Sequence, residues 1–256
     1  EEARKILRDQ LKKTDDPLRR HWGLFQLHRQ DHSYYSAVAI KYVQEGKTEL
    51  AEEARKQAAQ SSELAVQSLE QAYQIRPDEP RIHEALLSIY LNGRNWEKAE
   101  KLIARAEEAN WDGVAGLYFR GRLHNKKGES LAAEDKQAAN KEYQEALKCL
   151  EEAVQKREKF HQAWAEKART EEHLGRREAA LESARRAEQQ NPRSFLAVRL
   201  LLELTVGEWS RAEVADNPME ARRLAEETYG LAKRVLKLNP NYRRAEFFKR
   251  AYLDKY

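Results

Sequence analysis

The chain has 256 residues, of which 41% are hydrophobic and 35% charged, and its 47 Lys and Arg against 43 Asp and Glu give a formal net charge of +4. This apolar fraction is too high, and the net charge too small, for a disordered chain. A single cysteine excludes an intramolecular disulfide, and no apolar run approaches the roughly 18 residues that cross a bilayer. Long stretches rich in Ala, Glu, Lys, Arg and Leu predict an all-α protein without a sheet.

Residues 1–31 predict an N-terminal helix pair. An apolar stripe marks the first helix, Asp16 and Pro17 signal the start of the second, and a further stripe follows them. We interpret this pair as a cap or a degenerate repeat. His28 and His32 would share a helix face, but we expect an interhelix turn at 31–33 and find no third metal ligand, so we predict surface histidines and no metal site.

The next segments repeat. Four stretches begin with a small residue and carry further Ala or aliphatic residues four and seven positions later; they start at Ala65, Ala99, Ala146 and Ala180. The first two starts lie 34 residues apart, and so do the last two. Pro77 and Pro192 follow the stripe where a helix has to stop. The first halves match one another through Trp164, Ala168 and Gly175 against Leu117, Gly121 and Gly128.

This pattern resembles the tetratricopeptide repeat (TPR), a 34-residue helix–turn–helix unit. The resemblance covers residues 32–242 and is best at about 80–113 and 161–194. It implies five repeats, stacked as antiparallel helix pairs in a right-handed α-solenoid, because one hairpin cannot bury its apolar face alone.

Repeats one, three and five are longer than the pattern, with insertions near 52–65, 128–140 and 208–221. Fourteen extra residues make about four helical turns, so a helix can lengthen without turning its buried stripe away. We expect long helices at 48–75 and 129–156, either as solvated extensions or as an arm for self-association or a partner. Thirteen extra residues in repeat three predict a loop or bulge near Lys126–Ser130. Asp216, Asn217 and Pro218 predict an N-cap and a helix start, within a loop that carries a helical turn.

The C-terminal residues 243–256 predict a capping helix with aromatic and basic side chains. From Glu220 to Tyr256 there are ten Lys and Arg against five Asp and Glu. A charged cap that keeps the array soluble explains this composition, and an RNA-binding or anionic membrane-binding surface is the alternative.

No catalytic constellation is present in the sequence: there is no phosphate-binding glycine loop, no nucleophile elbow and no CxxC motif. We therefore predict no enzyme and no cofactor. Cys149 is expected to be buried and inert on a packed helix, and His124 to serve packing. The five tryptophans, including Trp96, Trp111 and Trp209, are interpreted as packing anchors at hairpin turns and helix starts.

The TPR resemblance also implies a concave groove lined by the first helix of each repeat. Carried over to this chain, the groove positions are Arg81, Tyr118, Arg122, Asn125, Lys126, Arg169, His173 and Arg199. The cations among them outnumber the acidic groove residues Glu84, Glu172 and Glu203, and this net positive charge suggests an acidic peptide or partner helix across repeats three to five, with an ordinary solvated face as the alternative. The family's Lys-, Asn- and Arg-based clamp for a chaperone's C-terminal carboxylate is missing, since its positions hold Ser36, Ile40, Phe119, Gln162 and Glu166.

These observations predict a non-catalytic protein–protein interaction scaffold that binds a peptide or partner helix in its groove. The alternative is an RNA- or anionic-surface-associated factor that uses the basic C-terminal end. The partner's identity and the oligomeric state stay open. A cytoplasmic location is favoured, and an upstream signal or anchor is the alternative because the sequence starts at Glu1 without an initiator Met.

Overall fold

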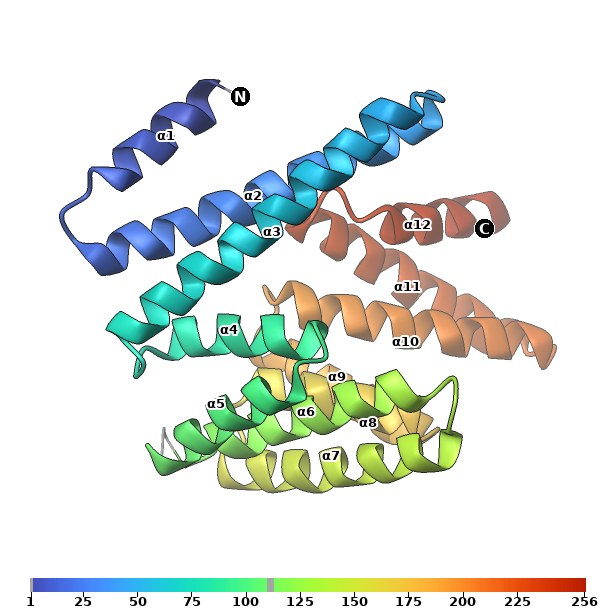
Figure 1. Ribbon diagram of the computed structural model, residues 1–256. Helices are drawn as coiled ribbons and strands as arrows, with labels where there is room; N and C mark the ends of the chain where they lie inside the picture. Colours follow the sequence, from blue (N-terminus) through green and yellow to red (C-terminus); the bar gives the residue numbers. More distant parts are fainter. Residues whose placement is uncertain (1, 110–112) are drawn as a thin grey trace. The chain divides into compact units, whose positions relative to one another are not determined.

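The structure is a computed structural model that describes residues 2–109 and 113–256, so Trp111 lies outside the described residues (Figure 1). Every regular element in these two ranges is an α-helix. The helices are α1 Glu2–Lys12, α2 Pro17–Gln44, α3 Thr48–Ile75, α4 Pro80–Asn92, α5 Trp96–Glu108, α6 Ala115–Leu131, α7 Lys136–Lys156, α8 His161–His173, α9 Arg177–Gln190, α10 Phe195–Val214, α11 Pro218–Leu238 and α12 Arg243–Lys255. This all-α architecture is the predicted fold class.

The chain forms two compact units, Glu1–Leu102 (unit 1) and Ile103–Tyr256 (unit 2), and the boundary between them falls inside α5. In unit 1, α1 packs on α2, α2 on α3, and α3 on α4. The α2–α3 hairpin dominates this unit, with 28 residues in each helix lying antiparallel along their whole length (Figure 1). Its core includes Phe25, Leu27 and Leu69.

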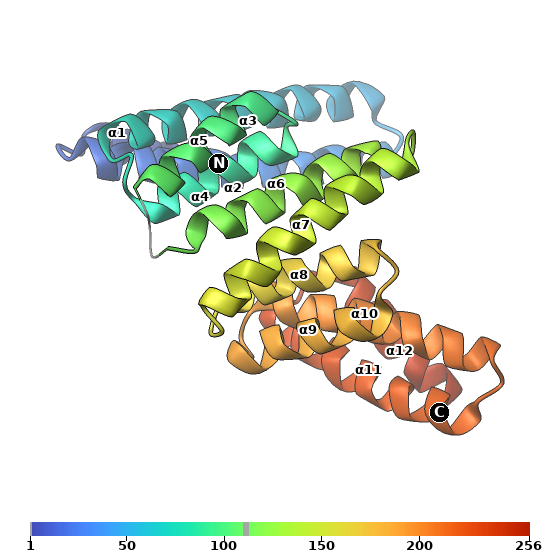
Figure 2. The same ribbon diagram turned by 90° about the horizontal axis from the view of Figure 1, so that it is seen from below.

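Unit 2 consists of helix pairs in sequence order, with α6 on α7, α8 on α9, α10 on α11, and finally α12 on α11 (Figure 2). Helix α8 also contacts both α6 and α10, so the first helices of three successive pairs form one layer. The small residues that the repeat pattern places between paired helices are buried in both units: Ala99, Ala146 and Ala180 expose none of their surface, and Ala65 exposes 6%. The predicted repeat register requires this burial.

The predicted interhelix turn at residues 31–33 is wrong, because α2 runs without interruption from Pro17 to Gln44. The turn was inferred from a polar run in the sequence. Asp31 in that run is buried and pairs with Arg8 on α1, and the next polar side chain, His32, places its Nδ1 2.9 Å from the carbonyl oxygen of Ala58 on α3. Polar side chains that find partners on neighbouring helices need no turn.

The insertion at 52–65 lies inside α3, which spans the predicted 48–75 range. It is not a solvated extension, because Ala54, Ala58 and Ser61 are buried against an equally long α2. A lengthened amphipathic helix exposes its apolar stripe unless its partner is lengthened too. The insertion in α3 is therefore covered by α2, which is long because it also includes residues 17–31.

The predicted loop near Lys126–Ser130 and the single helix at 129–156 are also wrong. Residues 126–130 are helical, α6 ends at Leu131, and α7 begins at Lys136 after a short turn. Asp135 caps α7 by accepting hydrogen bonds from the backbone N–H groups of Gln137 and Ala138. The thirteen extra residues are divided between α6 and α7. Because a turn separates the two helices, the apolar stripe of α7 need not be in phase with that of α6, and no bulge is required.

The third insertion, near 208–221, lengthens α10 and α11 in the same way. Asn217 is the predicted N-cap and accepts a hydrogen bond from the backbone N–H of Glu220, and Pro218 is the first helical residue. The expected loop with a helical turn is wrong, since only residues 215–217 separate the helices. Trp209 accordingly lies buried within α10 and not at a turn. Helix α12 occupies the segment where a capping helix is predicted.

Candidate functional site

The predicted groove residues of unit 2 belong to α6, α8 and α10, the three first helices that contact one another in that order. We call their surface the α6–α8–α10 face. Arg81 is the exception among the predicted groove residues: it is exposed on α4 in unit 1 and is considered with that unit only.

A cluster at the α6–α8 contact contains Lys126, Glu129 and His173. The Lys126 Nζ lies 2.6 Å from Glu129 Oε2, and His173 Nε2 lies 3.8 Å from Glu129 Oε1. The His173 ring stacks on Tyr143 with ring centroids 4.5 Å apart. Burial by itself would raise the pKa of Glu129, but the interactions with His173 and Lys126 and the charges of Lys126 and Arg169 outweigh it and lower the pKa to about 2. Glu129 is thus a fixed negative charge on this face.

On α8, Glu166 forms an ion pair with Arg169. The Arg169 Nη1 lies 3.1 Å from Glu166 Oε2, and the Glu166 side chain is only 7% exposed. Asn125 on α6 is buried, and its amide oxygen lies 2.9 Å from the Thr170 hydroxyl on α8. Asn125 therefore links α6 to α8, and its side chain has a structural role: it holds the two helices in position.

On α10, Arg199 Nη1 lies 3.0 Å from Glu203 Oε2. Two groups from the C-terminal segment meet the same carboxylate: the Tyr242 hydroxyl donates a 2.5 Å hydrogen bond to Glu203 Oε1, and Arg244 Nη1 lies 3.1 Å from that oxygen. Burial, and then the hydrogen bond to Glu203, raise the pKa of Tyr242. The capping helix thus closes onto the end of the face through Glu203.

Tyr118 and Arg122 form the other part of the α6 surface. Tyr118 is 5% exposed and packs against Phe160, with ring centroids 4.9 Å apart. The Arg122 guanidinium lies over the Tyr118 ring, 5.6 Å from its centroid, in cation–π geometry. The ring of Tyr118 therefore supports Arg122 from below.

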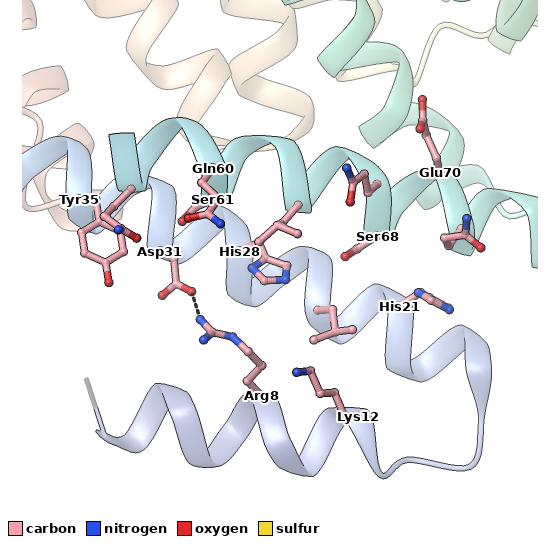
Figure 3. A pocket seen from close by; sticks show the side chains of 15 residues that line it. Arg8, Lys12, His21, His28, Asp31, Tyr35, Gln60, Ser61, Ser68 and Glu70 are labelled. Atoms are coloured by element: carbon pink, nitrogen blue, oxygen red, sulfur yellow. Dashed lines mark hydrogen bonds and ion pairs between the residues drawn. The ribbon is translucent and has the colours of Figure 1, made fainter. Parts of the chain in front are cut away.

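Sequence reasoning missed a pocket of about 620 Å³ in unit 1, between α1, α2 and α3 (Figure 3). Its charged and imidazole side chains are Arg8, Lys12, His21, His28, Asp31 and Glu70, and glutamine and serine side chains of α3 complete the wall. A signal was present in the sequence: Arg4, Arg8 and Lys12 recur every four residues, which places them on one face of the first helix. The pocket also contains His28, which is buried and not the surface histidine expected from the sequence.

Other residues singled out in the sequence have structural surroundings. Cys149 is half-buried, and burial raises the pKa of its thiol, which keeps it protonated. His124 Nδ1 lies 2.7 Å from Glu142 Oε2 between α6 and α7. Among the described residues, no three His, Cys, Asp or Glu side chains are arranged to hold a metal ion. The described helices also include none that is long and apolar enough for a membrane span.

Comparison with known proteins identified the fold. No family model matched the chain, and no curated protein did. Among solved structures, TTC0263, a thermophilic TPR protein of Thermus thermophilus, aligns with a TM-score of 0.57 and 14% identity over 87% of this chain and 98% of that chain. A monomeric mutant of IFIT1, solved with m7Gppp-AAAA, aligns with a TM-score of 0.54 and 14% identity over 99% of this chain and 60% of that chain. Together with the 34-residue register of buried small residues, these alignments show that the chain has the fold of the tetratricopeptide repeat proteins.

Proposed function

We propose that the chain is a non-catalytic interaction scaffold and that the α6–α8–α10 face binds an acidic segment of a partner protein. The observation that carries this proposal is the row of Lys126, Arg169 and Arg199, one cation on each of three successive first helices, each held in place by a carboxylate of its own helix. Adjacent packed helices lie about 8–10 Å apart, so the row suits an extended or helical segment with spaced carboxylates.

The ion pairs orient the cations without using up their hydrogen-bonding capacity. Arg169 contacts Glu166 through Nη1, and Arg199 contacts Glu203 through Nη1. A guanidinium carries five N–H donors in a planar fork, so each arginine has donors left for a partner's carboxylate. Holding the side chains in one rotamer before binding also lowers the entropic cost of association.

The charge distribution supports an acidic partner for unit 2. Residues 103–256 contain 30 Lys and Arg against 26 Asp and Glu, whereas residues 1–102 contain 17 of each. All of the net positive charge therefore belongs to the unit that carries the face. Such a surplus steers an acidic segment toward the face and makes its binding sensitive to salt.

The test is selection of binding segments from a displayed library of random peptides on the full chain, followed by affinity measurement for the enriched sequences. We expect acidic sequences to be enriched, and their affinity to fall roughly tenfold or more in the double variant Arg169→Gln and Arg199→Gln. Gln is used because Glu166 is buried, and Gln at position 169 can still donate a hydrogen bond to it. Raising the salt from about 50 to about 300 mM should weaken the wild type more than the variant.

The matched control removes two positive charges from the second helices of unit 2, with Lys148→Gln on α7 and Arg222→Gln on α11, both exposed. It should bind the selected peptides as the wild type does. Equal affinity of the groove variant and the wild type, with both variants folded by circular dichroism, would show that the α6–α8–α10 face is ordinary solvated surface.

The basic C-terminal end as an RNA or anionic membrane surface has less support. Its four paired cations all belong to one helix, α12: Arg244 pairs with Glu203, Lys249 and Arg250 with Glu246, and Lys255 with Glu213. They therefore present no row across successive helices comparable to that of Lys126, Arg169 and Arg199. Filter binding to RNA with a steep salt dependence would favour this alternative.

A further inference from the structure

We propose that the pocket between α1, α2 and α3 binds a small phosphorylated polyol, with its phosphate held by Arg8, Lys12 and His28 and its hydroxyl groups against the glutamine and serine side chains of α3. This inference concerns unit 1 and does not depend on the function proposed for unit 2. The volume of about 620 Å³ falls in the range of small-molecule sites and is larger than an inorganic phosphate requires.

The pocket has α2 as its floor and α1 and α3 as its walls (Figure 3). Helix α1 is fixed on α2 at two places. At one, Leu11 fills the space that a side chain at Gly23 would occupy, since a Cβ there would lie within 2.4 Å of Leu11 Cδ2. At the other, Arg8 Nη2 lies 2.8 Å from Asp31 Oδ2. The wall is thereby held with its polar side chains turned toward the floor.

Positive charge exceeds negative charge at this wall. Asp31 is buried and shared by two guanidiniums, Arg8 at 2.8 Å and Arg4 at 3.5 Å. Lys12 lies one turn beyond Arg8 on the same face of α1, and Figure 3 shows both side chains directed toward α2. Because Arg4, which does not line the pocket, shares Asp31 with Arg8, the two lining cations Arg8 and Lys12 are not fully neutralised by that carboxylate.

The second acid of the pocket, Glu70, does not cancel this surplus, because it is already partnered away from the wall. Its carboxylate accepts a 2.7 Å hydrogen bond from the Tyr90 hydroxyl and a 3.0 Å hydrogen bond from Lys98 Nζ. Tyr90 and Lys98 belong to α4 and α5.

His28 lies on the floor between the two walls, and it is 7% exposed. Burial lowers its pKa, the charges of Arg8 and Lys12 lower it further, and the charge of Asp31 opposes them. His28 is therefore neutral near pH 7, and a neutral imidazole still carries one N–H that can donate to a phosphate oxygen. A bound phosphate would favour the protonated imidazole and raise this pKa.

The α3 wall has the composition of a sugar-binding surface. Gln60, Leu64, Gln67 and Gln71 recur at helical spacing, so they lie on one stripe, and Ser61 and Ser68 are buried beside them. Amide and hydroxyl groups can each donate and accept, which matches the hydroxyl groups of a polyol. Leu24 and Leu64 offer a small apolar contact for its carbon skeleton.

The experiment is isothermal titration calorimetry of the full chain with three probes, glucose 6-phosphate, glucose and inorganic phosphate. Glucose 6-phosphate should bind, inorganic phosphate should bind more weakly, and glucose should give no heat. Lys12→Gln should weaken glucose 6-phosphate binding roughly tenfold or more. Lys13→Gln is the matched control, because Lys13 is exposed and next in sequence but does not line the pocket, and it should leave the affinity unchanged.

A second readout is the NMR titration of the His28 ring. Its pKa should rise when glucose 6-phosphate is bound, and ligand affinity should rise as the pH falls through that range. Absence of glucose 6-phosphate binding at millimolar concentration would overturn the proposal, as would equal affinity in Lys12→Gln and wild type. Binding of inorganic phosphate as tight as that of glucose 6-phosphate would overturn the assignment of the α3 wall to a polyol.

Discussion

Gly121 and Gly230 differ in how closely neighbouring side chains pack against them. Gly121 lies on α6 where α7 comes close, and a Cβ there would lie 2.5 Å from Leu150 Cγ. Gly230 lies on the exposed side of α11, and a Cβ there would meet nothing within 4 Å. The same residue type is thus required by packing at one position and not at the other.

Replacing these two glycines by alanine should therefore change stability in opposite directions. We expect Gly121→Ala to lower the free energy of unfolding by about 1–3 kcal/mol through overpacking. Gly230→Ala should raise it by about 0.5–1 kcal/mol, because alanine loses less backbone entropy in a helix. Urea denaturation of both variants measures the difference. Stabilisation by Gly121→Ala would contradict the close contact of α6 and α7.

The ionisation of Glu129 makes the free energy of unfolding depend on pH. Its pKa in the folded chain is about 2, below the ordinary value of 4.5, because the opposing groups on Lys126, His173 and Arg169 favour its ionised form despite burial. A depressed pKa contributes stability that is fully present above about pH 4.5 and is lost as the pH falls toward 2.

We expect the difference in unfolding free energy between the wild type and Glu129→Gln to stay constant above pH 4.5 and to shrink as the pH falls toward 2. Thermal melts of both proteins across this range measure it, and the comparison removes the effect of all other carboxyl groups. A difference that is the same at pH 7 and at pH 2.5 would mean that Lys126, Arg169 and His173 do not stabilise the ionised form of Glu129.

The helices of this chain differ in length because some of them contain insertions. The pairs at 80–108 and 161–190 have helices of 13 or 14 residues, whereas α2 and α3 have 28 residues each. The insertions at 128–140 and 208–221 are divided between the two helices of their hairpins, and the one at 52–65 lies in α3 opposite the equally long α2. The physical cause is that the apolar stripe of one long helix is covered only by an equally long partner.

This pairing predicts that deletion of residues 52–65 is tolerated only together with a matching deletion in α2. The single deletion removes the buried Ala54, Ala58 and Ala65 and leaves part of α2, including Leu27, without a partner. We expect a lower melting temperature and increased binding of a hydrophobic dye. Deleting 27–40 as well removes the facing segment and should restore cooperative melting with shorter helices.

The double deletion serves as the control. It also removes His28 and Asp31, and with them the unit 1 pocket, but it leaves no part of α2 without a facing segment. If the single deletion melts at the wild-type temperature and binds no dye, the segment 52–65 is a solvated extension after all.

For the molecule as a whole, the repeat pattern was legible in the sequence because small residues recur wherever paired helices touch. Ala99, Ala146 and Ala180 are predicted at such contacts and expose no surface. The all-helical class followed from composition, and the cap at Asn217 followed from residue chemistry that acts within four positions. Properties that depend on near neighbours along the chain are encoded locally, so the sequence alone determined them.

The tertiary structure decided what depends on neighbours far along the chain. Whether residues 31–33 turn or stay helical depended on Arg8 and Ala58, which lie 23 and 26 residues from their partners. The same is true of the α6–α8–α10 face, where Asn125 and Tyr118 are buried by α8 and by Phe160 and leave the surface to Arg122, Lys126, Arg169 and Arg199. The unit 1 pocket likewise exists only because α1 and α3 meet α2 at the same level. Periodicity fixes which face of a helix is buried, but the partner that covers each residue is set by packing between elements.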